Sequence, residues 1–211
     1  TAYRALSTMR CRDYVQQDPE SGSYTLGPAA LALATRHFEG DSLASGMHPA
    51  LVALSREVDE LVHLGVMRGD RVVYLDKVEP SRTIRVWSDI GRTVPVADTA
   101  LGRAILAFTA VERQQLDAYV PAGGPERADR LWGMIGFARG HGYSFEVEEN
   151  EPGIACLGVP LLRGNQPAGA MSVTTFASTF TARRRTELLR AVRDVVPPLL
   201  PVGIALPALH V

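Results

Sequence analysis

Residues 154–175 read IACLGVPLLRGNQPAGAMSVTT, two apolar runs on either side of a short polar turn. Ile154–Leu162 and Ala168–Thr175 have the length and apolar character of buried strands. Arg163–Gln166 between them contains glycine and asparagine, which tight turns favour. This stretch therefore predicts a pair of adjacent strands in the C-terminal part of the chain.

Similar patterns extend outward from this pair. Four more strands are predicted, the first two joined by a turn at residues 68–70: Leu61–Met67, Val72–Val78, Thr83–Trp87 and Tyr143–Val147. Apolar residues at helical spacing predict the helices: His48–Glu60, Asp98–Phe108, Val111–Tyr119, Pro125–His141 and Thr181–Val195, with Thr181 as the N-cap of the last. Together these elements predict the α+β class, with one largely antiparallel sheet flanked by helices.

The N-terminal residues have a different character. Residues 1–13 predict an arginine-bearing helix, and two short strands, Tyr14–Gln17 and Ser23–Leu26, flank a turn rich in Asp, Pro, Ser and Gly. An alanine- and leucine-rich helix, Pro28–Phe38, follows. We place the boundary between this part and the larger sheet within residues 27–47.

The composition argues against several classes of protein. A net charge of −1 is unlike that of a chain that binds nucleic acid along its whole length. Cys11 and Cys156 lie far apart, without CxxC or Cys/His spacing, so we expect no disulfide, metal site or cofactor. No apolar run reaches the roughly 18 residues of a membrane helix, and no secretory signal is visible, so we expect a cytoplasmic protein without a membrane partner.

Several motifs in a fixed order resemble one family, the IclR-type bacterial transcriptional regulators. TAYRALSTMRCRDYVQQDPESGSYTLGPAALALA at residues 1–34 resembles the end of the family's winged helix-turn-helix. VVYLDKVE at 72–79 and IGRTVPVADTALGRAILA at 90–107 resemble two segments of its sensing domain. GYSFEVEENEPGIACLGVPLLRGNQPAGAMSVT at 142–174 resembles its G-Y…E-E…G-x-x-C…P signature. One departure is Asp13, where the family usually has glycine.

The resemblance implies three segments: the C-terminal part of a winged helix-turn-helix (residues 1–27), a linker helix (28–46) and a GAF-like effector-binding domain (47–211). A winged helix-turn-helix is the DNA-reading head of such a regulator, and its recognition helix contacts base edges. The resemblance places Thr1, Tyr3 and Arg4 on that helix, as contacts to bases. Because the chain opens at Thr1 inside a helical pattern, we expect only part of the head to be present. We also expect these 211 residues not to read an operator specifically on their own.

The resemblance also implies a small-molecule site. Carried over by motif, its ligand contacts fall on the backbone of Ala100 and Leu101 at a helix start, and on four side chains: Glu146, Cys156, Ser172 and Thr174. Free N–H groups at a helix start favour an anion, so we expect a carboxylate. The i, i+2 spacing of Ser172 and Thr174 puts both hydroxyls on one face of their strand. Taken alone, a cysteine such as Cys156 is most often a small buried hydrophobe, and Ser172 and Thr174 could simply cap the polar face of the sheet. We expect Glu148 and Glu149 to be solvated loop charges.

The implied function is effector-responsive control of transcription of a catabolic operon, by a protein that senses a small organic or aromatic acid. Its expected partners are operator DNA, the effector, and further copies of the chain in a homodimer or homotetramer. One alternative is a stand-alone small-molecule sensor without DNA function. Another is an enzyme with Cys156, His141 and Glu149 as nucleophile, base and orienting group, although no catalytic motif is present.

Overall fold

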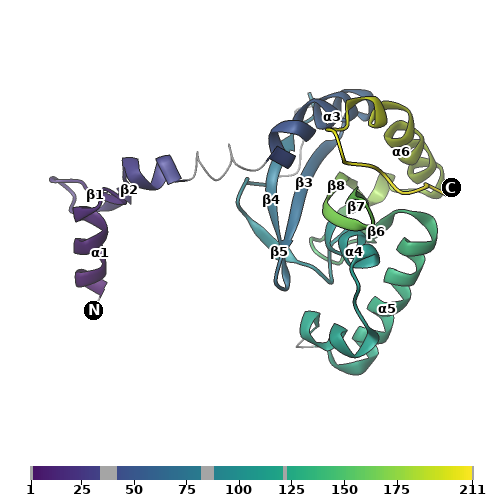
Figure 1. The fold of residues 1–211 in the computed structure, drawn as a ribbon, viewed down its shortest axis with the longest axis horizontal. Helices are drawn as coiled ribbons and strands as arrows, with labels where there is room; N and C mark the ends of the chain where they lie inside the picture. Colours follow the sequence, from purple (N-terminus) through teal and green to yellow (C-terminus); the bar gives the residue numbers. More distant parts are fainter. Residues whose placement is uncertain (1, 34–41, 82–87, 121–122, 211) are drawn as a thin grey trace. The chain divides into compact units, whose positions relative to one another are not determined.

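A computed structural model describes residues 2–33, 42–81, 88–120 and 123–210 of the chain (Figure 1). The chain divides into two compact units, residues 1–45 and 46–211. Each unit is described by itself.

The first unit is a helix followed by a small hairpin. Helix α1 (Ala2–Cys11) has no buried residue, and the strands β1 (Val15–Gln17) and β2 (Tyr24–Leu26) pair antiparallel. Residues 28–33 are helical. Between α1 and β1, Asp13 adopts a left-handed backbone conformation with φ 57°. Aspartate is one of the few residues besides glycine that tolerate this conformation, which explains how it can stand where the related pattern has glycine.

The second unit is built on a six-stranded antiparallel sheet with the order β5-β4-β3-β8-β7-β6. Its strands are β3 (Leu61–Arg68), β4 (Arg71–Val78), β5 (Thr93–Pro95), β6 (Ser144–Val147), β7 (Ile154–Arg163) and β8 (Gln166–Phe176). Most of β7 and β8 is buried, because helices cover both faces of the sheet. The predicted α+β class and the predicted β7–β8 pair are confirmed.

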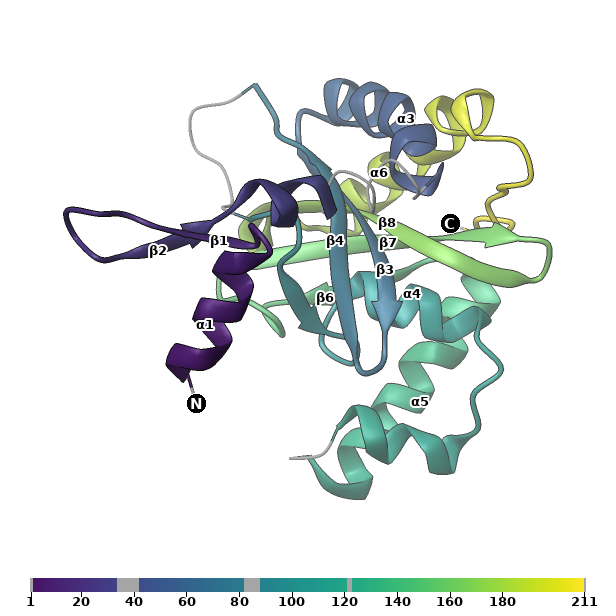
Figure 2. The same cartoon turned by 60° about the vertical axis from the view of Figure 1, so that its left-hand side comes forward.

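Helices lie on the two sides of this sheet, α3 with α6 on one side and α4 with α5 on the other (Figures 1 and 2). Their bounds are α3 (Ser42–Val58), α4 (Ala100–Phe108), α5 (Gly124–His141) and α6 (Ala182–Val195), with short 3-10 helices η1 (Arg113–Tyr119), η2 (Ala177–Thr179) and η3 (Pro197–Leu199). Thr181 caps α6 as predicted, accepting a hydrogen bond from the N–H of Arg184 at 3.1 Å. None of the described helices is long and apolar enough to cross a membrane.

The structure differs from the prediction at the start of α3 and at β5. The helix predicted to begin at His48 begins at Ser42, because Leu43 and Met47 continue its buried face toward the N-terminus. Strand β5 was not predicted, since only three residues pair with β4. The strand predicted at Thr83–Trp87 lies outside the described residues.

Helix α4 approaches the sheet closely over two glycines. A Cβ atom on Gly158 would lie 2.5 Å from the carbonyl oxygen of Ala100, and one on Gly65 would lie 3.1 Å from the side chain of Leu101. Thr99 caps the helix, accepting a hydrogen bond from the N–H of Gly102 at 3.2 Å. The first turn of α4 therefore rests directly on the backbone of β7 and β3.

Adding one methyl group at Gly158 tests this packing. We expect Gly158→Ala to lower the free energy of unfolding by about 1–3 kcal/mol, the usual cost of overpacking, because the new Cβ meets backbone atoms that cannot rotate away. Urea unfolding followed by circular dichroism measures the change. Gly136→Ala is the control: it lies in α5 with no atom near its Cβ position, and should be neutral or stabilising by up to about 1 kcal/mol. Equal midpoints for Gly158→Ala and the unmodified protein would contradict the close approach.

Candidate functional site

A row of polar side chains crosses the sheet on the side of α4. The strand register places Glu146 opposite Cys156, Cys156 opposite Thr174, and Ser172 opposite His63. Residues directly opposite each other on antiparallel strands share a face. The Cys156 Sγ atom lies 3.4 Å from Thr174 Oγ1, which lies 3.3 Å from His63 Nδ1. The structure thus brings together the four side chains that the motifs suggested, and adds a histidine.

His63 was missed because a lone histidine in an apolar strand has no distinguishing spacing. Its ring stacks on Tyr74 with a centroid distance of 4.4 Å, and Nε2 lies 2.7 Å from the hydroxyl of Ser88. Burial, together with the positive charges of Lys77 and Arg92, lowers the pKa of His63 to about 3. The imidazole is therefore neutral near pH 7, with one nitrogen as donor and the other as acceptor.

Several buried donors around this row have no partner among the described residues. They include the hydroxyls of Ser172 and Tyr74 and the N–H groups of Ala100 and Leu101 in the first turn of α4. Ala100 lies over Gly158, which is opposite Ser172 on the sheet, so its N–H and the serine hydroxyl belong to the same neighbourhood. A buried polar group without a partner costs about 1–3 kcal/mol, which a bound polar molecule can recover.

The two acidic groups of the row, the Cys156 thiol and the Glu146 carboxyl, both have raised pKa values. Burial raises the pKa of the Cys156 thiol well above its ordinary value, and the neighbouring Glu146 raises it further. Burial also raises the pKa of Glu146, against hydrogen bonds from Cys156 and from the backbone N–H of Glu149 that lower it. Burial thus disfavours negative charge on both acidic groups of the row.

Glu149 is an exposed loop charge, as expected, but it also forms an ion pair that the sequence did not reveal. Both its carboxylate oxygens pair with the guanidinium of Arg103, one of them at 2.8 Å. The Arg103 side chain is 3% exposed and also donates to the carbonyl oxygen of Ala97 at 2.8 Å. This ion pair ties the loop after β6 to α4. Sequence spacing could not reveal it, because 46 residues separate the partners.

The suggested catalytic set does not assemble. The Cys156 thiol contacts Thr174 and Glu146, while Nδ1 of His141 lies 2.9 Å from the carbonyl oxygen of Phe137 and the Glu149 carboxylate pairs with Arg103. A nucleophilic cysteine also needs a lowered pKa, whereas that of Cys156 is raised. Within the described ranges, no group of three or more His, Cys, Asp or Glu side chains is placed to hold a metal ion.

In the first unit, two of the three residues suggested for DNA contact can be placed. Tyr3 is 74% exposed and Arg4 is also exposed, both on α1. Thr1 lies outside the described residues.

Comparison with known proteins identifies the family. Residues 38–198 match the family described as bacterial transcriptional regulator IclR C-terminal. The chain belongs to the IclR family of bacterial transcriptional regulators. It is similar to the HTH-type transcriptional regulator XynR of Escherichia coli K12, with 32% identity over an alignment of 192 residues that covers 84% of this chain and 73% of XynR. This family consists of transcriptional regulators, not enzymes.

Solved structures of IclR proteins share the fold. The crystal structure of IclR from Thermotoga maritima aligns with a TM-score of 0.73 and 26% identity, covering 94% of this chain and 83% of the other. An IclR homolog from Microbacterium hydrocarbonoxydans, solved in complex with 4-hydroxybenzoate, aligns with a TM-score of 0.76 and 18% identity, covering 94% and 84%. The curled antiparallel sheet with its flanking helices is thus the effector-domain fold of IclR regulators.

The depressed pKa of His63 predicts a pH dependence of stability. Between pH 6.5 and 3 the unfolded chain protonates this histidine and the folded one does not, so stability should fall as the pH drops through this window. The group should contribute a loss of about 2 kcal/mol between pH 8 and pH 5. Urea unfolding of the unmodified protein and of His63→Gln at both pH values measures it, because groups common to both proteins cancel. If the free energy of unfolding fell equally in both proteins between pH 8 and pH 5, the pKa of His63 would not be depressed.

Proposed function

We propose that the polar row beneath α4 is the effector site of this IclR regulator, and that its ligand is a small organic acid. One observation carries the proposal: buried donors of Ser172, Ala100 and Leu101 lie together without partners among the described residues. A carboxylate can accept hydrogen bonds from the serine hydroxyl and from both backbone N–H groups. The start of α4 adds the favourable end of its helix dipole.

The other side chains of the row, Glu146 above all, indicate which class of organic acid would bind. Glu146 would repel an anionic ligand unless its carboxyl is protonated or accepts a hydrogen bond from a ligand hydroxyl. The raised pKa of Glu146 favours the first arrangement, and a hydroxy acid satisfies the second. We therefore propose a hydroxy or keto acid with a compact body, held also by Cys156 and Thr174. The 4-hydroxybenzoate bound by the Microbacterium homolog is an acid of this kind.

The proposed response is a linkage between ligand and DNA. A ligand that binds one arrangement of an oligomer more tightly shifts the spacing of paired reading heads, and with it the affinity for a two-part operator. We assign residues 1–27 to the reading head, 28–46 to the linker and 47–211 to the sensor. The compact units at 1–45 and 46–211 support this division. Thr1, Tyr3 and Arg4 are proposed for base contacts, on operator DNA in the cytoplasm.

The two alternatives predict different results. A stand-alone sensor would bind the acid without any effect on salt-dependent binding to operator DNA. An enzyme would turn the acid over, which the protonated Cys156 and its partners disfavour. Neither catalysis nor a cofactor enters the proposal.

Removing the unpaired hydroxyl tests the site. We expect Ser172→Ala to weaken binding of a hydroxy acid such as 4-hydroxybenzoate roughly ten-fold or more, because a hydrogen bond to a charged partner contributes about 1.5–3 kcal/mol. Isothermal titration calorimetry measures the affinity, and operator binding without ligand should not change.

Ser178→Ala is the matched control, since Ser178 is an exposed serine just beyond the same strand. Ser172→Ala combined with Thr174→Val should abolish the response to ligand. Retention of full affinity by this double variant would place the effector site elsewhere.

Paired reading heads also predict an oligomer. Leu31 and Leu33 are 69% and 58% exposed in the helical segment at residues 28–33, and would supply apolar surface for pairing between linkers. We expect a mass of at least twice that of the chain in multi-angle light scattering at micromolar concentration. Leu33→Glu should shift the equilibrium toward smaller species. A monomeric mass for the unmodified protein at all concentrations would contradict the paired arrangement.

A further inference from the structure

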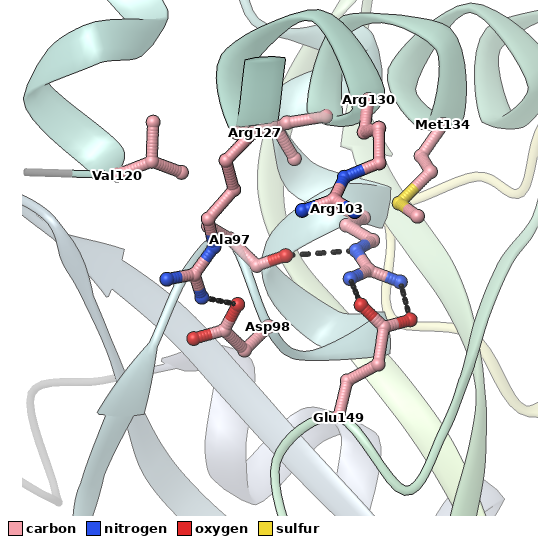
Figure 3. A pocket seen from close by; sticks show the side chains of 9 residues that line it. Ala97, Asp98, Arg103, Val120, Arg127, Arg130, Met134 and Glu149 are labelled. Carbon is pink, nitrogen blue, oxygen red and sulfur yellow. Dashed lines mark hydrogen bonds and ion pairs between the residues drawn. The ribbon is translucent and has the colours of Figure 1, made fainter. Parts of the chain in front are cut away.

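Two adjoining cavities lie beside α5. Their volumes are about 300 and 330 Å³, and both are lined by Arg103, Arg130, Met134 and Glu149. Neither is lined by Cys156, Ser172 or Thr174. They share these four lining residues and therefore adjoin each other between α5 and the loop after β6; we call the two together the arginine pocket, and Figure 3 shows the first of them.

The arginine pocket carries an excess of positive charge. Arg103 pairs with Glu149, and Arg127 pairs with Asp98. The third guanidinium, that of Arg130, has no carboxylate partner among the described residues. Three arginines against two carboxylates leave one positive charge. Figure 3 shows the side chains of Arg127 and Arg130 extending from α5 into the pocket, Arg127 toward Asp98 and Arg130 toward Arg103.

Apolar side chains form the remaining walls. Leu131 and Val120 line one part, while Met134, Phe137 and Phe145 line the part nearer β6. An unpaired cation beside apolar surface suits a ligand that has an anionic end and an apolar body. Solvated inorganic anions gain nothing from such walls, because only apolar groups are stabilised by leaving water.

We propose that the arginine pocket is a second ligand site, which binds a small organic carboxylate with an aromatic or aliphatic body. The guanidinium of Arg130 provides a planar pair of donors that matches a carboxylate, and Arg127 lies on the preceding turn of α5. The apolar body lies against Met134, Phe137 and Phe145. Glu149 competes with the incoming carboxylate, because it already occupies the donors of Arg103. This site uses side chains other than those proposed to hold the effector, Cys156, Ser172 and Thr174.

The experiment is a calorimetric titration of the protein with benzoate and hexanoate, alongside acetate and inorganic phosphate, which lack an apolar body. At least one of the first two should bind more tightly than both of the others. Arg130→Gln should weaken that binding about ten-fold. Glu149→Gln should strengthen it a few-fold, because the competing carboxylate is lost.

Two control variants separate the possible sites. Arg190→Gln removes an exposed arginine of α6 with the same change in net charge and should leave the affinity unchanged. Ser172→Ala should leave it unchanged as well. Loss of affinity in Ser172→Ala but not in Arg130→Gln would place the acid in the effector site and overturn only the second site. Tighter binding of phosphate, no binding of benzoate or hexanoate, or equal affinity in Arg130→Gln and the unmodified protein would also overturn it.

Discussion

The close contact between α4 and the sheet governs the geometry of the sensing unit. It exists because Gly158 and Gly65 have no Cβ atoms to hold the helix away, and because the hydroxyl of Ser144 donates a hydrogen bond to the carbonyl oxygen of Ala100. Thr99 fixes the point at which the helix begins. The free N–H groups of the first turn consequently lie at the level of the polar row. Larger side chains at these two positions would hold the helix further from the sheet, and its free N–H groups would then be exposed to water.

The sequence predicted the sheet better than the site. Strands β3, β4, β7 and β8 could be recognised because they are long apolar runs separated by glycine-containing turns. Strand β5 escaped recognition because its three residues owe their conformation to pairing with β4, a tertiary effect. Helix α3 begins six residues before the predicted start at His48, and Pro49 lies inside it. A buried face that includes Leu43 and Met47 outweighs the hydrogen bond lost at that proline.

Motifs suggested a set of site residues that the fold does bring together, but their electrostatic surroundings could not be read from the sequence. His63 reaches Thr174 across 111 residues of chain, and its neutrality depends on burial and on charges from other strands. Arg103 belongs to a recognisable motif, yet its partner Glu149 lies in a loop whose residues look solvated. Such pairings become visible only once the register of the strands is known.

Glu149 connects the arginine pocket to the polar row on the sheet. Its carboxylate satisfies Arg103 in the arginine pocket, while its backbone N–H donates to Oε2 of Glu146 in the polar row at 3.1 Å. The loop therefore cannot move away from Arg103 without also disturbing a hydrogen bond that lowers the pKa of Glu146. Glu146 in turn contacts the Cys156 thiol, so this loop is linked to two members of the polar row. A single loop residue thus links the polar row on the sheet to an ion pair outside it.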